Sequence, residues 1–110
     1  MYAPILEINT NKVTENAKKF SEFCTSKGVE LVFATKGFSA RPEVIRAAMA
    51  GGITSFADSR MKNIVAAKRA IPGLKYLLIR VPAIPEADEV VRWADWSLQS
   101  QIEVIRAVSE

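Results

Sequence analysis

A lysine at the end of an apolar run is the residue of this sequence with the clearest chemical potential. The run Leu31–Ala34 leads directly into Thr35, Lys36 and Gly37. A short run of this kind is typical of a buried strand, so Lys36 should emerge at the end of a strand. A lysine amine beside small residues has room for a ligand, and when desolvated it can act as a nucleophile on a carbonyl group. The alternative is a lysine that simply extends its ammonium group into solvent.

Polar residues follow the other apolar runs as well. Asp58–Arg60 follow the next run, Arg80 lies near the end of a third, and Ser97–Ser100 follow a fourth. In barrels of parallel strands, side chains at the carboxyl ends of the strands meet at one face and form the site. These residues and Lys36 are therefore candidates for one site. Each also has a structural alternative: the residues after the second run can cap a helix, and Arg80 can pair with a carboxylate.

Composition excludes several classes of function. The 110 residues contain no histidine and one cysteine, which excludes a disulfide within the chain, a histidine-based triad and a zinc site. The net charge of +3 is scattered, and Lys18–Lys19 is the longest basic run, so we expect no nucleic-acid partner. No apolar run approaches the roughly 20 residues that a membrane span needs. The N-terminus has no signal-peptide pattern, so we expect a cytoplasmic protein without a membrane partner.

Apolar periodicity predicts alternating strands and helices. The strands are predicted at Ile5–Ile8, Leu31–Ala34, Ile53–Ala57, Leu74–Val81 and Trp96–Leu98. The helices are predicted to begin at Asn9 or Thr10, at Pro42, at Asp58 or Ser59, after Pro82 and Pro85, and at a capping box of Ser100–Glu103. Gly28, Gly51–Gly52 and Pro72–Gly73 should end the first three helices.

The alternation indicates an α/β fold with a parallel sheet. Strands recur about every 20 residues with a helix in each gap, as in a doubly wound sheet or a (β/α)8 barrel. No glycine-rich nucleotide-binding loop follows any strand, which argues against nucleotide-binding doubly wound folds. A complete barrel takes about 250 residues. We therefore interpret the chain as the first half of a TIM barrel, about four βα units, and expect its open sheet edges to associate with a second copy as a homodimer.

Several short motifs resemble the alanine-racemase-type (fold type III) pyridoxal-phosphate enzymes. The opening Pro4–Asn9, with Lys12, Val13 and Asn16, is similar to the start of that family, and Phe33–Lys36 stands where the family has its cofactor lysine. Within the family, the likeness is greatest to the ornithine-racemase-like amino-acid racemases. Their pattern is followed in order by Phe56–Arg60, Asn63, Leu78–Pro82, Val90–Val91 and Ala94–Asp95.

The resemblance implies a pyridoxal 5′-phosphate cofactor, an amino-acid substrate and racemisation at its Cα. Lys36 would hold the cofactor and act as the base on one face of the substrate, while Ser59, Arg60 and Arg80 would contact the cofactor. Residues 1–110 would form the N-terminal part of the barrel domain. The rest of the barrel, the phosphate site, a C-terminal β domain and the second acid-base group would lie outside the chain. We therefore expect the 110 residues alone to be inactive.

The chain departs from the alanine racemases at one position, because they have a tyrosine four residues after the lysine and this chain has Ala40. Two alternatives therefore stay open. The segment Ser39–Val44 with Gly51–Gly52 loosely fits enzymes similar to D-threonine aldolase or D-serine dehydratase, which use a metal bound by later residues. A non-enzymatic pyridoxal-phosphate-binding homeostasis protein is the other alternative, although the predicted strand Ile5–Ile8 argues against it.

Overall fold

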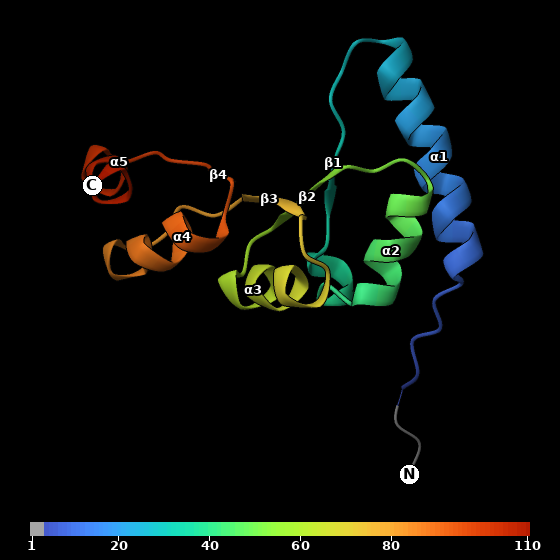
Figure 1. The fold of residues 1–110 in the computed structure, drawn as a ribbon, viewed down its shortest axis with the longest axis horizontal. Coiled ribbons are helices and arrows are strands. Elements are labelled where there is room, and N and C mark those ends of the chain that lie inside the picture. Colours follow the sequence, from blue (N-terminus) through green and yellow to red (C-terminus); the bar gives the residue numbers. More distant parts are fainter. Residues whose placement is uncertain (1–3) are drawn as a thin grey trace.

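The computed structural model describes residues 4–110, in which helices alternate with four parallel strands (Figure 1). The strands are β1 (Val32–Ala34), β2 (Ser55–Asp58), β3 (Lys75–Leu78) and β4 (Trp96–Ser97). The α-helices are α1 (Thr10–Ser26), α2 (Pro42–Ala50), α3 (Met61–Ala70), α4 (Ala87–Trp93) and α5 (Ile102–Ser109). Two 3₁₀ turns, η1 (Lys36–Phe38) and η2 (Ile84–Glu86), follow β1 and precede α4. The predicted α/β class with parallel strands is confirmed.

The predicted signals set most helix ends. Asn9 caps α1, because its side-chain oxygen accepts a hydrogen bond from the backbone N–H of Lys12 at 3.1 Å. Pro42 is the first residue of α2, where its missing N–H costs nothing. Gly28 follows α1 with a φ of 68°, a conformation that glycine adopts without strain.

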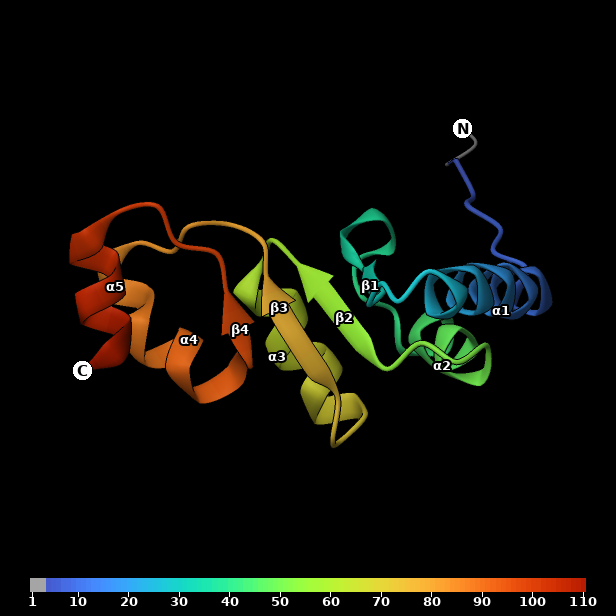
Figure 2. The same ribbon diagram turned by 90° about the horizontal axis from the view of Figure 1, so that it is seen from above.

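The sheet has the order β1-β2-β3-β4, and Figure 2 shows the strands crossing the molecule in that order. Phe33, Phe56 and Tyr76 lie in register on neighbouring strands, with ring centroids 6.1 and 5.9 Å apart. Phe56 and Tyr76 are fully buried in the core with residues of α2, α3 and α4 such as Ile45, Ile64 and Val90. This face of the sheet is therefore the one that the helices cover.

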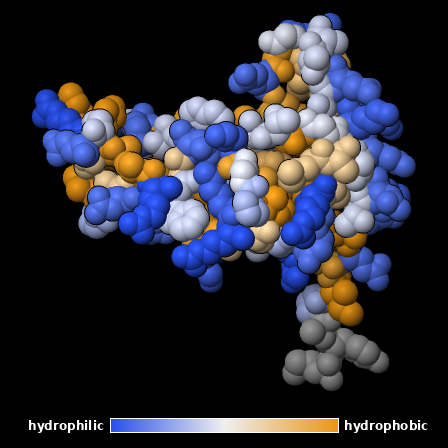
Figure 3. All heavy atoms as spheres, in the orientation of Figure 1, coloured by the Kyte–Doolittle hydropathy of each residue, from blue (hydrophilic) through white to orange (hydrophobic). Residues whose placement is uncertain are grey.

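The opposite face of the sheet and its two outer edges are open. Val32 and Trp96, on the outer strands, are 38% and 51% exposed. The radius of gyration is 15.5 Å, whereas about 13 Å is expected for a compact domain of this length. In Figure 3, apolar residues reach the surface at several places on the molecule. The chain therefore has the form of an open, curved layer of strands and helices.

Four predicted features differ in the structure. Ile5–Ile8 is not a strand: no described strand pairs with this exposed segment, and strands need a partner. The third strand covers only Lys75–Leu78 of the predicted Leu74–Val81, since its neighbours are equally short. The capping box at Ser100 does not form, because Gln101 precedes α5 without a side-chain cap. The helical spacing of Val13, Ala17 and Phe20 predicts one core-facing side of α1, but Phe20 is 63% exposed.

None of the described helices is long and apolar enough to span a membrane.

Candidate functional site

Lys36 lies directly after β1, as the first residue of the turn η1. Val32 and Ala34, four and two positions before Lys36, are exposed on the uncovered face of the sheet. Lys36 is exposed, and its amine makes no hydrogen bond or ion pair within residues 4–110. The space beside neighbouring Gly37 is open, with no atom within 4 Å of where a Cβ would stand. A free primary amine thus faces open space, although the described residues do not desolvate it.

Ser59 and Arg60 lie between β2 and α3, at the same end of the sheet as Lys36. Arg60 is the residue preceding α3, and its guanidinium is exposed. Its backbone N–H donates to Oδ1 of Asp58 at 2.8 Å. Asp58 therefore satisfies a backbone donor at the start of α3, as its sequence position predicted, although the N-cap residue itself is Arg60.

Arg80 follows β3 and is bound on two sides. Its Nε donates to the carbonyl oxygen of Ser59 at 2.9 Å, and its Nη1 and Nη2 donate to the two carboxylate oxygens of Glu86 at 3.1 and 3.0 Å. The hydrogen bonds to Glu86 raise the pKa of Arg80, and the same bonds, with that from the Ala83 N–H, lower the pKa of Glu86. Arg80 therefore joins the ends of β2 and β3 and pairs with a carboxylate, which was the structural alternative.

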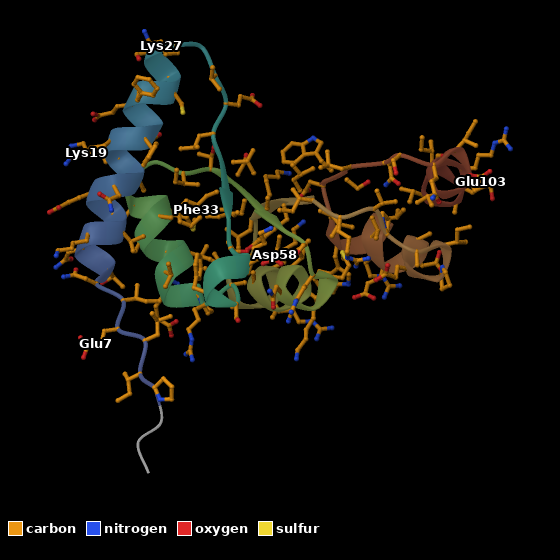
Figure 4. The ribbon with its side chains drawn as sticks, turned by 180° about the vertical axis from the view of Figure 1, so that it is seen from behind. Glu7, Lys19, Lys27, Phe33, Asp58 and Glu103 are labelled. Atoms are coloured by element: carbon orange, nitrogen blue, oxygen red, sulfur yellow. The ribbon has the colours of Figure 1, made fainter. Side chains whose placement is uncertain are left out.

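A buried hydrogen-bonded group behind Lys36 was not predicted as part of the site. Thr35 and Asp58 are both 0% exposed, and Oγ1 of Thr35 lies 2.7 Å from Oδ2 of Asp58. The hydroxyl of Tyr76 donates to Oγ1 of Thr35 at 3.0 Å, and burial raises the pKa of Tyr76 to about 12. The Nδ2 of Asn63 contacts both oxygens of Asp58, which is labelled in Figure 4, at 3.3 and 3.1 Å. We call Thr35, Asp58, Asn63 and Tyr76 the polar cluster.

The polar cluster could have been suspected from strand alternation. Because side chains alternate along a strand, the sequence places Thr35 opposite to Val32 and Ala34, and a buried hydroxyl there needs a partner. The Asp58 carboxylate stands at the end of the neighbouring strand. Tyr76 lies within a predicted strand, where a packed aromatic is the expected occupant, and nothing in its sequence context reveals that its hydroxyl reaches Thr35.

The loops that carry the predicted site residues are thus joined to one another. The Thr35–Asp58 bond joins the ends of β1 and β2, and the Arg80–Ser59 bond joins the ends of β2 and β3. The structure brings Lys36, Ser59, Arg60 and Arg80 to one end of the sheet. Lys36 is the one primary amine among them, and no residue of the described range 4–110 engages it. The arrangement can present an exposed amine to a carbonyl compound, with cationic side chains on neighbouring loops.

The chain is similar in sequence to two curated amino-acid racemases. It is 31% identical over 110 residues to lysine racemase of Thermotoga maritima, covering all of this chain and 31% of that protein. It is 27% identical over 107 residues to ornithine racemase of Acetoanaerobium sticklandii, covering 97% of this chain and 30% of that protein. The chain therefore spans about a third of the length of these relatives. No protein-family model matches it.

Solved structures show the same fold. Alanine racemase from E. faecalis superposes with a TM-score of 0.76 at 20% identity, over 94% of this chain and 28% of that one. PipY of Synechococcus elongatus, solved with pyridoxal phosphate bound, superposes with a TM-score of 0.70 at 20% identity, over 84% of this chain and 45% of that one. The expected likeness to part of an alanine-racemase-type barrel is confirmed.

Proposed function

We propose that this chain is the part of an amino-acid racemase that holds pyridoxal 5′-phosphate through Lys36. The chain is a distant relative of the amino-acid racemases, and it has the fold of the N-terminal part of the alanine-racemase barrel. The observation that carries the proposal is the position of the Lys36 amine, exposed just beyond the end of β1 and unpaired among residues 4–110. An attached cofactor needs a primary amine of this kind, with open space beside it.

The chemistry asked of Lys36 is simple. The Nζ of Lys36 would hold pyridoxal phosphate, because a primary amine can condense with the cofactor's aldehyde group with loss of water. The bound cofactor supplies an electron sink that makes the Cα proton of an amino acid removable. The Lys36 Nζ would also be the group that accepts that proton on one face of Cα.

The arginines have different roles in this proposal. Arg60 has an exposed guanidinium and can contact an anionic group of the cofactor or substrate, with Ser59 beside it as a hydroxyl donor. The guanidinium of Arg80 is already bound by Glu86 and by the Ser59 carbonyl oxygen. We therefore propose that Arg80 contributes mainly by fixing the Ser59 backbone, and that a direct cofactor contact would require it to leave Glu86.

Racemisation needs a second acid-base group on the opposite face of the substrate Cα. The predicted site residues on this chain all lie at one end of a four-stranded layer, and Lys36 is the one among them with a free amine. We propose that the 110-residue chain binds the cofactor without racemising amino acids. Its incubation with alanine, lysine or ornithine in D2O should leave the Cα proton unexchanged, as read by mass spectrometry. Exchange that depends on Lys36 would contradict this.

We also propose that the chain associates with a second copy of itself. The outer edges of β1 and β4 have no strand partner among residues 4–110, and apolar Val32, Trp96 and Leu98 stand exposed near them. An apolar groove between α1 and β1, lined by Val13 and Phe20 among others, adjoins the β1 edge. Open parallel edges with apolar flanks favour pairing between chains.

A titration with pyridoxal phosphate tests the attachment. The wild-type chain should shift the cofactor absorbance as the C=N bond forms, and both Lys36→Ala and Lys36→Arg should abolish the shift. Lys36→Arg keeps the charge but cannot condense with the aldehyde in this way. Lys19→Ala is the matched control, since Lys19 is an exposed lysine on α1 (Figure 4). A shift that survives in Lys36→Ala would overturn the proposal.

A pyridoxal-phosphate-binding protein without racemase activity is the second candidate function. PipY, which shares the fold, was solved with pyridoxal phosphate bound and so supports cofactor binding, whereas the sequence relatives favour a racemase.

A further inference from the structure

We infer that Thr35 and Asp58 are positioning residues for Lys36: their buried hydrogen bond locks the turn that aims the lysine. This inference rests on the proposed role of Lys36 and adds two residues to which no role in cofactor binding was assigned. Neither side chain is exposed, so both act through the backbone of the neighbouring lysine.

The backbone of Thr35 leaves the strand conformation at this residue. Its φ and ψ are −103° and −3°, whereas a residue in a parallel strand has a ψ of about +115°. The chain therefore leaves the extended conformation at Thr35, immediately before the turn η1 begins at Lys36. Because Lys36 follows Thr35 directly, rotation about the ψ of Thr35 moves the Cα of Lys36. The conformation of Thr35 therefore fixes the position from which the lysine side chain extends.

The main chain of Thr35 is held at both ends. Its N–H donates to the carbonyl oxygen of Ala57 at 2.8 Å, which continues the pairing of β1 with β2. Its carbonyl oxygen accepts the N–H groups of Phe38 at 3.3 Å and Ala40 at 3.0 Å, so the loop after the lysine closes back onto Thr35. Ser39 and Ala40 have φ values of 54° and 53°, in the left-handed region that non-glycine residues rarely adopt.

The side chain of Thr35 supplies the remaining support. Its hydroxyl has one proton and faces two acceptors, Oδ2 of Asp58 at 2.7 Å and the Ala57 carbonyl oxygen at 3.2 Å. The shorter distance and the charge favour donation to Asp58. Tyr76 then donates to Thr35, so the bonds run in one direction from Tyr76 through Thr35 to Asp58.

Asp58 is buried with uncharged donors only. Its oxygens accept from Thr35, from the Arg60 N–H and from Asn63, and the ion pairs within residues 4–110 involve Asp95 and Glu86 instead. Removing the Thr35 hydroxyl would leave this carboxylate short of a donor in a buried place. Through these hydrogen bonds the Asp58 carboxylate fixes Thr35, the residue before the turn η1, and the backbone of Arg60.

Substitutions at Thr35 separate positioning from general stability. Thr35→Val keeps the shape and removes the hydroxyl, whereas Thr35→Ser restores the hydroxyl. We expect Thr35→Val to weaken the apparent affinity for pyridoxal phosphate by about tenfold or more and Thr35→Ser to recover most of it. Ile64→Val, which removes a buried methyl group from α3 but no hydrogen bond of the polar cluster, is the matched control and should bind the cofactor as wild type does. If Thr35→Val does not fold, Asp58→Asn takes its place.

Hydrogen exchange gives a second readout that needs no cofactor. In Thr35→Val the amides of Phe38 and Ala40 should lose protection relative to the rest of the sheet, because the carbonyl that they bond is no longer fixed. Cofactor affinity or amide protection in Thr35→Val no more reduced than in Ile64→Val would overturn the inference. A wild-type chain that shows no cofactor absorbance shift would instead overturn the proposed function, and the exchange measurement would still decide whether Thr35 locks the turn.

Discussion

Gly51→Ala should destabilise the chain although the backbone at this position suits alanine. Gly51 ends α2 with a φ of −84° and a ψ of 0°, which alanine adopts without strain. Replacing glycine at such a position usually stabilises by about 0.4–1 kcal/mol, because the unfolded chain loses freedom. The neighbouring helix α1 reverses this expectation.

A Cβ on Gly51 would lie 2.5 Å from the carbonyl oxygen of Thr14, 2.6 Å from the Cβ of Ala17 and 2.9 Å from the backbone nitrogen of Lys18. Two of these atoms are helix backbone, so relief requires α1 to move away from α2. Movement would also strain the bond from the Thr14 hydroxyl to the Ala47 carbonyl oxygen, 2.8 Å long. Overpacking of this kind costs about 1–3 kcal/mol, so we expect a net loss of roughly 1–2 kcal/mol.

Urea unfolding followed by circular dichroism measures the effect. Gly37→Ala is the control, because its Cβ would meet no atom within 4 Å and its φ is not positive; it should be neutral or stabilising by up to about 1 kcal/mol. In thermal unfolding the Gly51→Ala loss should appear as a decrease in Tm of about 4 °C or more. A Gly51→Ala chain as stable as the wild type would refute the close packing of α1 on α2.

Three further predictions follow from buried or open polar groups. Burial raises the pKa of Tyr76 from 10.0 to about 12, so the folded state keeps the phenol proton at a pH where the unfolded state has lost it. The free energy of unfolding should therefore fall as the pH rises from about 10 to about 12. In a pH series of urea unfolding, Tyr76→Phe should remove that part of the fall. Burial acts to raise the pKa of Asp95, but hydrogen bonds from Lys68 and from the Tyr76 N–H lower it overall. The ionised Asp95 carboxylate therefore stabilises the folded chain above pH 3.8, the ordinary pKa of aspartate. This stabilisation is lost as the pH falls through the lowered pKa of the folded state. Asp95→Asn should accordingly be less stable than wild type by about 1 kcal/mol at pH 7 and equally stable in strong acid, as read by thermal unfolding across that range. Light scattering after size exclusion should give the mass of a dimer for the wild-type chain. Trp96→Lys, which places a charge beside the β4 edge, should shift the chain toward the monomer. A wild-type monomer at high concentration would contradict pairing through the open edges.

The sequence alone predicts the parts of the fold that depend on local chemistry. Asn9, Pro42 and Gly28 act within a few residues of their own positions, so their roles at helix ends could be inferred without a structure. The apolar run Leu31–Ala34 predicted a strand with Lys36 just beyond its end, and β1 does end at Ala34, two residues before Lys36.

The features that the sequence did not predict depend on partners distant along the chain. Ile5–Ile8 has the composition of a strand but no described neighbour to pair with. Arg80 pairs with Glu86, but its second acceptor is the carbonyl oxygen of Ser59, 21 positions away. The hydroxyl of Tyr76 meets Thr35 across 41 positions. Contacts of this kind follow from the order and register of the strands, which periodicity does not specify.

Mapping the lysine that carries the cofactor tests the central claim most directly. After incubation with pyridoxal phosphate, borohydride reduces the C=N bond to a stable amine, and peptide mass spectrometry locates the added mass. At substoichiometric cofactor we predict the adduct on Lys36, with little on exposed lysines such as Lys19 and Lys27 (Figure 4). An adduct spread evenly over the exposed lysines, or one that is undiminished in total when Lys36 is replaced by alanine, would contradict the account.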